Sequence, residues 1–265
     1  MALYGELHAH SGFSFLDGAS DPEELVVAAT QLGLSALALT DHHGLYGAVR
    51  FAEAARAVGL PTIFGAEITM SGGGARMGVS DPVGEHLVVL ARNPEGYRHL
   101  SALVAEGHLR LGEKGTPIFH YDELAPHAAS WRILTGCRKG PLVQSLVQEG
   151  PRAASRRLRE LHDLFGESLA VEIWDHGHPD DVVRNDVLAE LAVRHHVTLV
   201  ATGNVHYASP AALHRSHVLA AIRAGRPLVE MDGWLSPSPG AALRSDAEQR
   251  TRFARWPGVV DAAGE

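Results

Sequence analysis

The sequence predicts an α/β fold in which helices cover both faces of a parallel sheet. Seven short apolar runs of strand type occur along the chain, and most are followed by a segment with apolar residues at helical spacing. Such alternation is typical of a parallel sheet buried on both faces. Seven consecutive units in 265 residues indicate a distorted TIM-like (β/α)7 barrel that is closed or nearly closed.

The individual elements are predicted from the spacing of apolar residues and from the capping and turn residues between them. The expected strands span residues 3–7, 34–40, 61–64, 86–91, 131–134, 169–174 and 197–201. The expected helices span residues 20–33, 46–58, 94–106, 142–148, 151–165, 181–195 and 210–224. The first helix should be capped by Ser20, with Glu23 three residues later and Pro22 in the first turn. Residues 107–130 are poorly periodic, which favours a loop with one short helix.

The composition changes near residue 225, where a barrel of residues 1–224 is expected to end. A Pro- and Ser-rich run follows at residues 234–240, which is typical of a surface linker. Residues 242–256 could form one more polar helix. We therefore expect residues 225–265 to contain a linker and the start of a following region, as in a longer protein.

Charge and composition narrow the function classes. The formal net charge is −8, which argues against a domain that holds nucleic acid by bulk electrostatics. There is no apolar run of about 18 residues and no secretion signal, so no membrane association is expected. Cys137 is the only cysteine, which excludes an intrachain disulfide and fits a cytoplasmic location.

The residues most capable of chemistry follow the predicted strands. His8 and His10 lie two apart at the end of the first strand, so their imidazoles should point the same way and could clamp a transition metal. In barrels of this type the chemistry lies at the C-terminal ends of the strands. Other candidates follow strands in the same way: His42, Glu67, Cys137, Asn204 and His206. His86 is the exception, because it starts its strand and the pattern does not explain how it would reach the others.

Five segments between residues 7 and 208 carry a family resemblance. They read LHAHSGFSFLDGAS, ALALTDHHGLYGAVRF, HLVVLARN, ILTGCRKG and ATGNVHYA. The chain resembles the PHP (polymerase and histidinol phosphatase) family. It is most similar to the N-terminal PHP domain of bacterial C-family DNA polymerase III alpha subunits of the error-prone type, whose tail is also similar around residues 232–235.

The resemblance implies a metal centre with nine ligand positions. Up to three divalent cations are implied, Zn²⁺ and/or Mn²⁺ with Mg²⁺ as an alternative, and Asp17, His42 and Glu67 would be closest to the catalytic chemistry. The implied reaction is hydrolysis of a phosphodiester at a DNA 3′ end, in the manner of a 3′→5′ exonuclease. The implied ligands are His8, His10, Asp17, His42, Glu67, His86, Cys137, Asn204 and His206.

Further residues are expected around the ligands. Asp41 should support His42 or a neighbour rather than bind metal. His43 and His176 should lie outside the ligands, either supporting them or merely solvated. Arg138 and Lys139 could meet a phosphate, although a solvated loop explains them equally well. Asp17 could also be a turn residue before Gly18, and Cys137 a small buried hydrophobe.

Asn204 departs from the family pattern, which has an aspartate there. The anions that remain are Asp17, Glu67 and the Cys137 thiolate, set against as many as six positive charges, so one metal is expected to bind more weakly. This leaves three readings: a DNA-end phosphoesterase, a metal-binding scaffold that supports a polymerase, or a free-standing phosphatase of the histidinol phosphatase kind. No polymerase centre or phosphate-binding Gly-Lys loop is present. The expected partners are a DNA 3′ end and the remainder of a polymerase chain.

Overall fold

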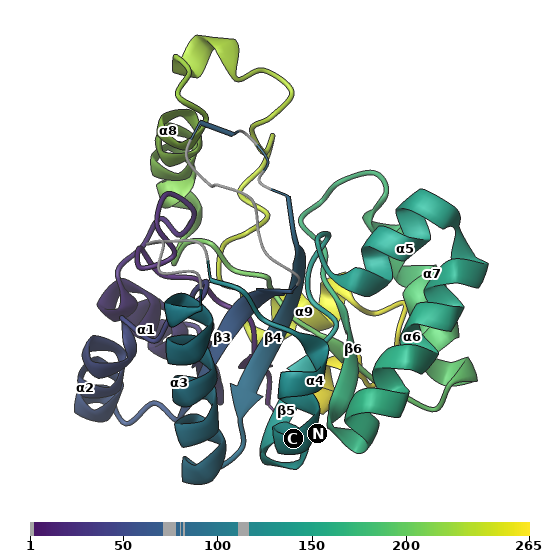
Figure 1. Cartoon of the computed structure of the whole chain (residues 1–265). Coiled ribbons are helices and arrows are strands. Elements are labelled where there is room, and N and C mark those ends of the chain that lie inside the picture. Colours follow the sequence, from purple (N-terminus) through teal and green to yellow (C-terminus); the bar gives the residue numbers. More distant parts are fainter. Residues whose placement is uncertain (1–2, 71–77, 80, 82, 111–116) are drawn as a thin grey trace.

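The computed structural model describes residues 3–70, 78–79, 81, 83–110 and 117–265, and these form an α/β fold around one curled sheet (Figure 1). The strands lie in chain order across the sheet, from β1 to β7. All seven predicted strands are present, although β1 is short and β3 continues past the predicted end. Their bounds are β1 Gly5–Glu6, β2 Ala36–Leu39, β3 Thr62–Met70, β4 Glu85–Ala91, β5 Trp131–Leu134, β6 Leu169–Ile173 and β7 Thr198–Ala201.

The sheet is not fully parallel, which corrects the sequence prediction. Strand β4 runs antiparallel to both β3 and β5, whereas the other neighbouring pairs are parallel. A parallel connection needs a crossover, usually a helix, and the sequence offers no helical run between Glu67 and His86. Without such a crossover, β4 pairs with β3 in the antiparallel direction.

The two ends of the sheet approach each other just beyond β1 and β7. A parallel bridge joins Ala9 to Val205, with the amide N of His10 2.8 Å from the carbonyl O of Val205. The amide N of Val205 is likewise 2.8 Å from the carbonyl O of His8. This bridge draws the segments that follow the first and last strands to the same place.

The helices lie outside the sheet, with α1, α2 and α3 on one side and α5, α6 and α7 on the other (Figure 1). Each packs an apolar face inward, as the spacing predicts. The main helices are α1 Pro22–Gln31, α2 Ala48–Val58, α3 Pro94–Leu109, α5 Pro141–Glu149, α6 Pro151–Phe165, α7 Asp181–Arg194 and α8 Leu213–Ala224. Among the described residues, no helix is both long enough and apolar enough to cross a bilayer.

The predicted cap of the first helix needs correction. Helix α1 is capped by Asp21 rather than Ser20, and Glu24 accepts the backbone N–H of Asp21. The Ser20 hydroxyl instead accepts a hydrogen bond from the Ala208 amide, a contact 188 residues away that local spacing cannot reveal. In the stretch before β5, the one short α-helix that was expected is α4 Tyr121–Leu124, and a 3₁₀ helix at Ala125–Ser130 follows it. Residues 111–116 of this stretch lie outside the described residues.

The C-terminal segment packs into the same core as the strands. The predicted helix at 242–256 is shorter, α9 Asp246–Arg252, and is followed by α10 Val259–Ala262. Phe253, Val259 and Val260 are buried in the main hydrophobic cluster. Residues beyond 224 thus contribute to this core, and the division at residue 224 stays a prediction.

Candidate metal centre

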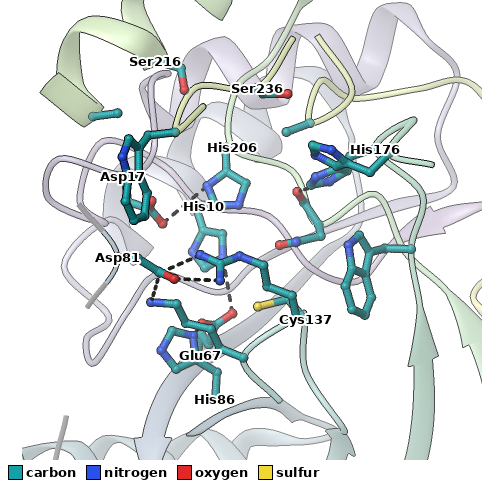
Figure 2. Close-up of a pocket in the computed structure, with 18 of the residues that line it drawn as sticks. His10, Asp17, Glu67, Asp81, His86, Cys137, His176, His206, Ser216 and Ser236 are labelled. Atoms are coloured by element: carbon teal, nitrogen blue, oxygen red, sulfur yellow. Dashed lines mark hydrogen bonds and ion pairs between the residues drawn. The ribbon is translucent and has the colours of Figure 1, made fainter. Parts of the chain in front are cut away.

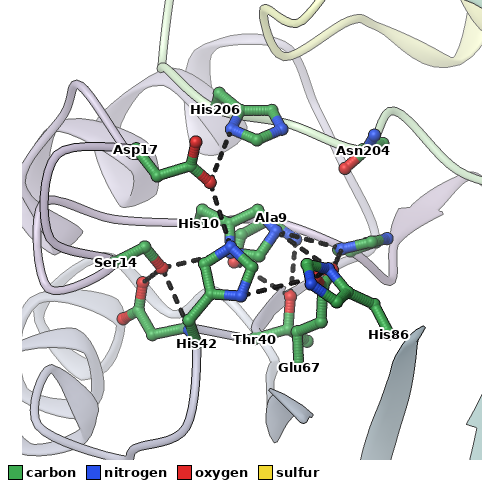
Figure 3. A network of polar contacts seen from close by, with 12 residues as sticks. Ala9, His10, Ser14, Asp17, Thr40, His42, Glu67, His86, Asn204 and His206 are labelled. Atoms are coloured by element: carbon green, nitrogen blue, oxygen red, sulfur yellow. Dashed lines mark hydrogen bonds and ion pairs between the residues drawn. The ribbon is translucent and has the colours of Figure 1, made fainter. Parts of the chain in front are cut away.

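Six of the predicted ligand residues form three overlapping groups at one edge of the sheet (Figure 3). In each group the candidate ligand atoms lie within 4.8 Å of one another, and any two groups share one residue. His8, His10 and Asp17 follow β1, His42 follows β2, and His86 lies at the start of β4. Glu67 was expected after its strand but lies within β3, because β3 continues to Met70. The groups are His8, His10 and Glu67; His10, Asp17 and His42; and His42, Glu67 and His86.

Glu67 lies at the centre of this arrangement and uses a different oxygen toward each side. Its Oε2 is 2.7 Å from His8 Nε2 and 3.5 Å from His10 Nε2. Its Oε1 is 3.3 Å from His42 Nδ1 and is also in close contact with His86 Nδ1. A carboxylate with one oxygen facing each of two groups is suited to bridge two cations.

Asp17 forms the outer side of the cluster. Its Oδ2 lies 3.0 Å from His42 Nε2 and 3.4 Å from His206 Nδ1, while its Oδ1 accepts a 2.7 Å bond from Arg223. Burial alone would raise the pKa of Asp17. The histidines, His206 first and then His42, outweigh burial and hold the pKa well below its ordinary value.

The antiparallel direction of β4 explains how His86 reaches the cluster. Because β4 is reversed, its first residues lie at the same edge as the last residues of the parallel strands. His86 pairs with Thr69 in the ladder, two residues beyond Glu67. The loop after β5 approaches closely here, since Gly136 has a φ of 78° and a Cβ on it would collide with the His86 carbonyl.

The last three predicted ligands lie around the cluster without joining a group. Cys137 and His206 line the same cavity as His10, Asp17 and Glu67 (Figure 2). Asn204, which is labelled in Figure 3, lines this cavity too. Asn204 has a left-handed backbone, with a φ of 41°, which asparagine tolerates better than most residues. Its Oδ1 is buried and has no hydrogen-bond partner among the described residues.

The donor set fits divalent cations. Imidazole nitrogens and carboxylate oxygens are ligands of zinc and manganese, and a thiolate would favour zinc. The three groups contain only six different side chains, and an imidazole ring ordinarily gives one nitrogen to one ion. Three ions would therefore need Cys137, Asn204, His206 or water as additional ligands.

Electrostatics within the cluster favour carboxylates that stay ionised. Burial opposes ionisation of Glu67, but His86 and His42 hold its pKa well below the ordinary value. Burial also opposes a charge on His8, yet Glu172 and Glu67 raise its pKa to about 10. Burial, together with the charge of Glu67, raises the pKa of the Cys137 thiol. A cation at the cluster would reverse this preference, because it stabilises a thiolate and a neutral imidazole.

The residues predicted to support the ligands occupy different positions. Asp41 accepts hydrogen bonds from Ser11 and from the Ser14 hydroxyl, which is 3.1 Å from His10 Nδ1 and also accepts the His42 amide. Asp41 therefore supports this part of the cluster through Ser14. His43 turns away toward β3, where its Nε2 is 2.6 Å from the Thr69 hydroxyl.

His176 supports the segment that carries Asn204. Its Nε2 is 2.9 Å from the Gly203 carbonyl O and 3.0 Å from that of Asn204. Burial is the main cause that lowers the pKa of His176 to about 3, so the ring is neutral and donates through an N–H. His176 thus contacts the backbone of a predicted ligand.

The predicted phosphate-binding cations face a carboxylate. Arg138 donates to Asp81 at 2.6 and 2.9 Å, and Lys139 Nζ lies 2.7 Å from the same side chain. All three residues line the same cavity of about 650 Å³ as the cluster residues. Figure 2 shows Asp81 in this cavity. Two cations that hold one carboxylate form an anion-binding arrangement, and a role toward phosphate stays a prediction.

Two buried carboxylates next to the cluster, Glu6 and Glu172, were not among the residues predicted from the sequence. Glu6 in β1 accepts hydrogen bonds from the amides of His8 and Gly203 and from the Tyr4 hydroxyl. Glu172 in β6 lies 2.7 Å from His8 Nδ1. The available signal was one acidic residue inside each apolar strand run, which is unusual because an unpaired buried carboxylate is costly.

Fold and site together define an α/β protein whose sheet edge forms a cavity lined by histidines and carboxylates. The chain belongs to the PHP domain family, whose model matches residues 6–176. A Bifidobacterium adolescentis protein assigned as a metal-dependent phosphoesterase has a similar fold, with a TM-score of 0.53 and 18% identity over 95% of this chain and 96% of that chain.

Among named relatives, the chain is similar to error-prone DNA polymerases. It is 54% identical over 264 residues to that of Mycobacterium bovis and 52% identical over 261 residues to that of Cutibacterium acnes, covering 99% and 97% of this chain. It is 37% identical to DNA polymerase III subunit alpha of Treponema pallidum over 76% of this chain. The chain spans 24%, 23% and 18% of the length of these relatives, respectively.

Proposed function

We propose that this chain is a metal-dependent phosphoesterase domain of an error-prone DNA polymerase and that it hydrolyses phosphodiesters at DNA 3′ ends. The observation that carries the proposal is the set of three overlapping ligand groups centred on Glu67. Bound divalent ions would supply an acidified water and neutralise charge on the phosphate oxygens. They would also give an acidic protein a local positive site for an anionic substrate.

The burial and position of each residue indicate which role it would have in the metal centre. The side chains of His8, His10 and Glu67 are almost fully buried and would hold a cation rigidly. Asp17 and His42 also line the cavity and are less deeply buried, so with Glu67 they would be closest to a bound substrate. The predicted ligands His86, Cys137, Asn204 and His206 would complete the coordination.

The substrate part of the proposal rests on the cavity and on the relatives. Arg138 and Lys139 line the cavity and could exchange Asp81 for a substrate phosphate. The similarity to polymerases extends over nearly the whole of this chain, which favours a DNA end over a small phosphomonoester. We expect the remainder of a polymerase chain to be the other partner.

A scaffolding role is the second candidate, and one observation favours it. Together the ligand groups join the segments after β1 and β2 to β3 and to the start of β4, so bound ions would cross-link four parts of the sheet. Metal binding of this kind stabilises a fold whether or not anything is hydrolysed. The two roles therefore need a test that measures cleavage and stability separately.

The test uses a 5′-labelled single-stranded oligonucleotide incubated with the protein and Mn²⁺ or Zn²⁺. We expect a ladder of shortened products that disappears with EDTA and in the His8→Ala/His10→Ala variant. No cleavage together with metal-dependent stabilisation would overturn the nuclease in favour of the scaffold. Hydrolysis of p-nitrophenyl phosphate but not of DNA would instead support a histidinol-phosphatase-like enzyme.

A further inference from the structure

Glu172 is the only acidic residue of strand β6, whose five residues are all buried. Its side chain has no exposed surface. Its backbone N–H donates to the Thr135 hydroxyl, and its Oε1 accepts the Thr202 hydroxyl. The same Oε1 lies 2.7 Å from His8 Nδ1. An apolar side chain would pack equally well at this buried strand position, so packing alone does not explain why a carboxylate is present.

We propose that Glu172 is a positioning residue that orients His8 for a divalent cation. A neutral imidazole has one N–H and one lone pair, and the nitrogen that donates determines which nitrogen can bind a metal. With Nδ1–H donated to Glu172, the Nε2 lone pair faces Glu67 and His10, where the first ligand group lies. The role rests on the proposed metal centre.

The geometry separates Glu172 from the other buried carboxylate. Glu6 holds backbone amides of His8 and Gly203 and leaves the imidazole untouched. Glu172 contacts the ring itself, on the side opposite to Glu67. Its Oε2 is buried and has no hydrogen-bond partner among the described residues. The side-chain contacts of Glu172 with His8 and Thr202 are therefore both made by Oε1. Such a carboxylate increases the basicity of the ligand histidine as well as fixing its orientation.

This charge also changes the balance that Asn204 disturbs. Counting ligands alone leaves Asp17, Glu67 and the Cys137 thiolate against up to three divalent ions. Glu172 adds a fourth negative charge one imidazole away from the first ligand group. Its contribution should therefore appear as metal affinity, without direct coordination.

The experiment is a double-mutant cycle measured as metal affinity. Zn²⁺ and Mn²⁺ are titrated separately into wild type, Glu172→Gln, His8→Ala and the double variant, in competition with a fluorescent chelator. We expect Glu172→Gln to weaken binding of the tightest ion by roughly 10- to 100-fold when His8 is present. In the His8→Ala background the same change should have less than about a twofold effect, because the carboxylate acts through that ring.

Two further variants keep the test decisive. Thr202→Val removes only the hydroxyl that holds Oε1 and should give a smaller loss, which Thr202→Ser should restore. Glu190→Gln on the exposed face of α7 is the matched control for loss of one negative charge. Circular dichroism of the metal-free proteins establishes that each variant is folded.

The outcomes separate this role from the nuclease. An equal loss in both His8 backgrounds, or no loss at all, would overturn the positioning role. A wild-type chain that binds neither metal would overturn the metal centre and this role together. Tight binding with the predicted coupling but without DNA cleavage would remove only the nuclease proposal.

Discussion

The substitution Glu67→Gln should remove most of the stabilisation that metal ions give this fold. Glu67 belongs to two of the three ligand groups and presents one oxygen to each. Glutamine has nearly the same shape, so the change removes a charge and one oxygen donor without leaving a cavity. The loss should therefore appear in metal binding rather than in packing.

The size of the effect follows from linkage. At a free metal concentration of about 100 times Kd, one site adds about 2.7 kcal/mol to the free energy of unfolding. In a chain of this size that corresponds to a rise in Tm of roughly 5–10 °C. If the variant binds about 100-fold more weakly, the same metal concentration adds only about 0.4 kcal/mol, or roughly 1 °C.

The assay is thermal unfolding of each protein with added metal and with EDTA, so that any change in the metal-free protein cancels. Metal content after dialysis is measured in parallel. The matched control is Glu106→Gln, which removes a charge from the exposed face of α3. Equal metal content and an equal EDTA-induced fall in Tm for wild type and Glu67→Gln would refute the central role of this carboxylate.

Three further predictions concern the surroundings of the cluster. Asn204→Asp should raise metal occupancy by adding an anionic donor where Oδ1 is now unpaired, and equal metal content in both proteins would contradict this. Gly136→Ala should lower the free energy of unfolding by about 2 kcal/mol or more, measured in urea, because a Cβ meets the His86 carbonyl and φ is positive; an unchanged midpoint would refute the close approach. Burial opposes ionisation of Asp181, but Arg184 keeps the pKa of Asp181 below its ordinary value. The stability that this ionised carboxylate contributes is therefore present at neutral pH, and it is lost as the pH falls from about 4 through the folded-state pKa. In metal-free protein, Asp181→Asn should therefore lose less stability than wild type between about pH 7 and about pH 3, and parallel pH curves would exclude this contribution.

The number and order of the main elements could be predicted from local pattern. Apolar runs and capping residues depend on neighbours a few positions away, so α2 and β6 were placed within two residues. The cap of α1 could not be chosen correctly, because Ser20 is engaged by Ala208 from the other end of the fold. The direction of β4 was also missed, since an apolar run carries no information about the direction of its neighbours.

The candidate site was predicted only as a set of residues at strand ends. His8, His10 and Glu67 were expected to meet, and their ligand atoms do lie within reach of one another. Their coordination of a metal stays a prediction. Glu172 was missed because its partner His8 is 164 residues away and it lies within a strand rather than after one.

The amino-acid sequence by itself determined the α/β class, the order of the strands and helices, and most of the side chains that gather at one edge, because these depend on periodicity and on residues that follow apolar runs. Only the tertiary structure decided that β4 is antiparallel to its neighbours and brings His86 to the cluster. It also decided that Asp81 forms ion pairs with Arg138 and Lys139, and that Glu172 contacts the His8 imidazole. These features depend on pairing between distant segments, and burial and hydrogen-bond geometry select that pairing only when the whole chain has folded.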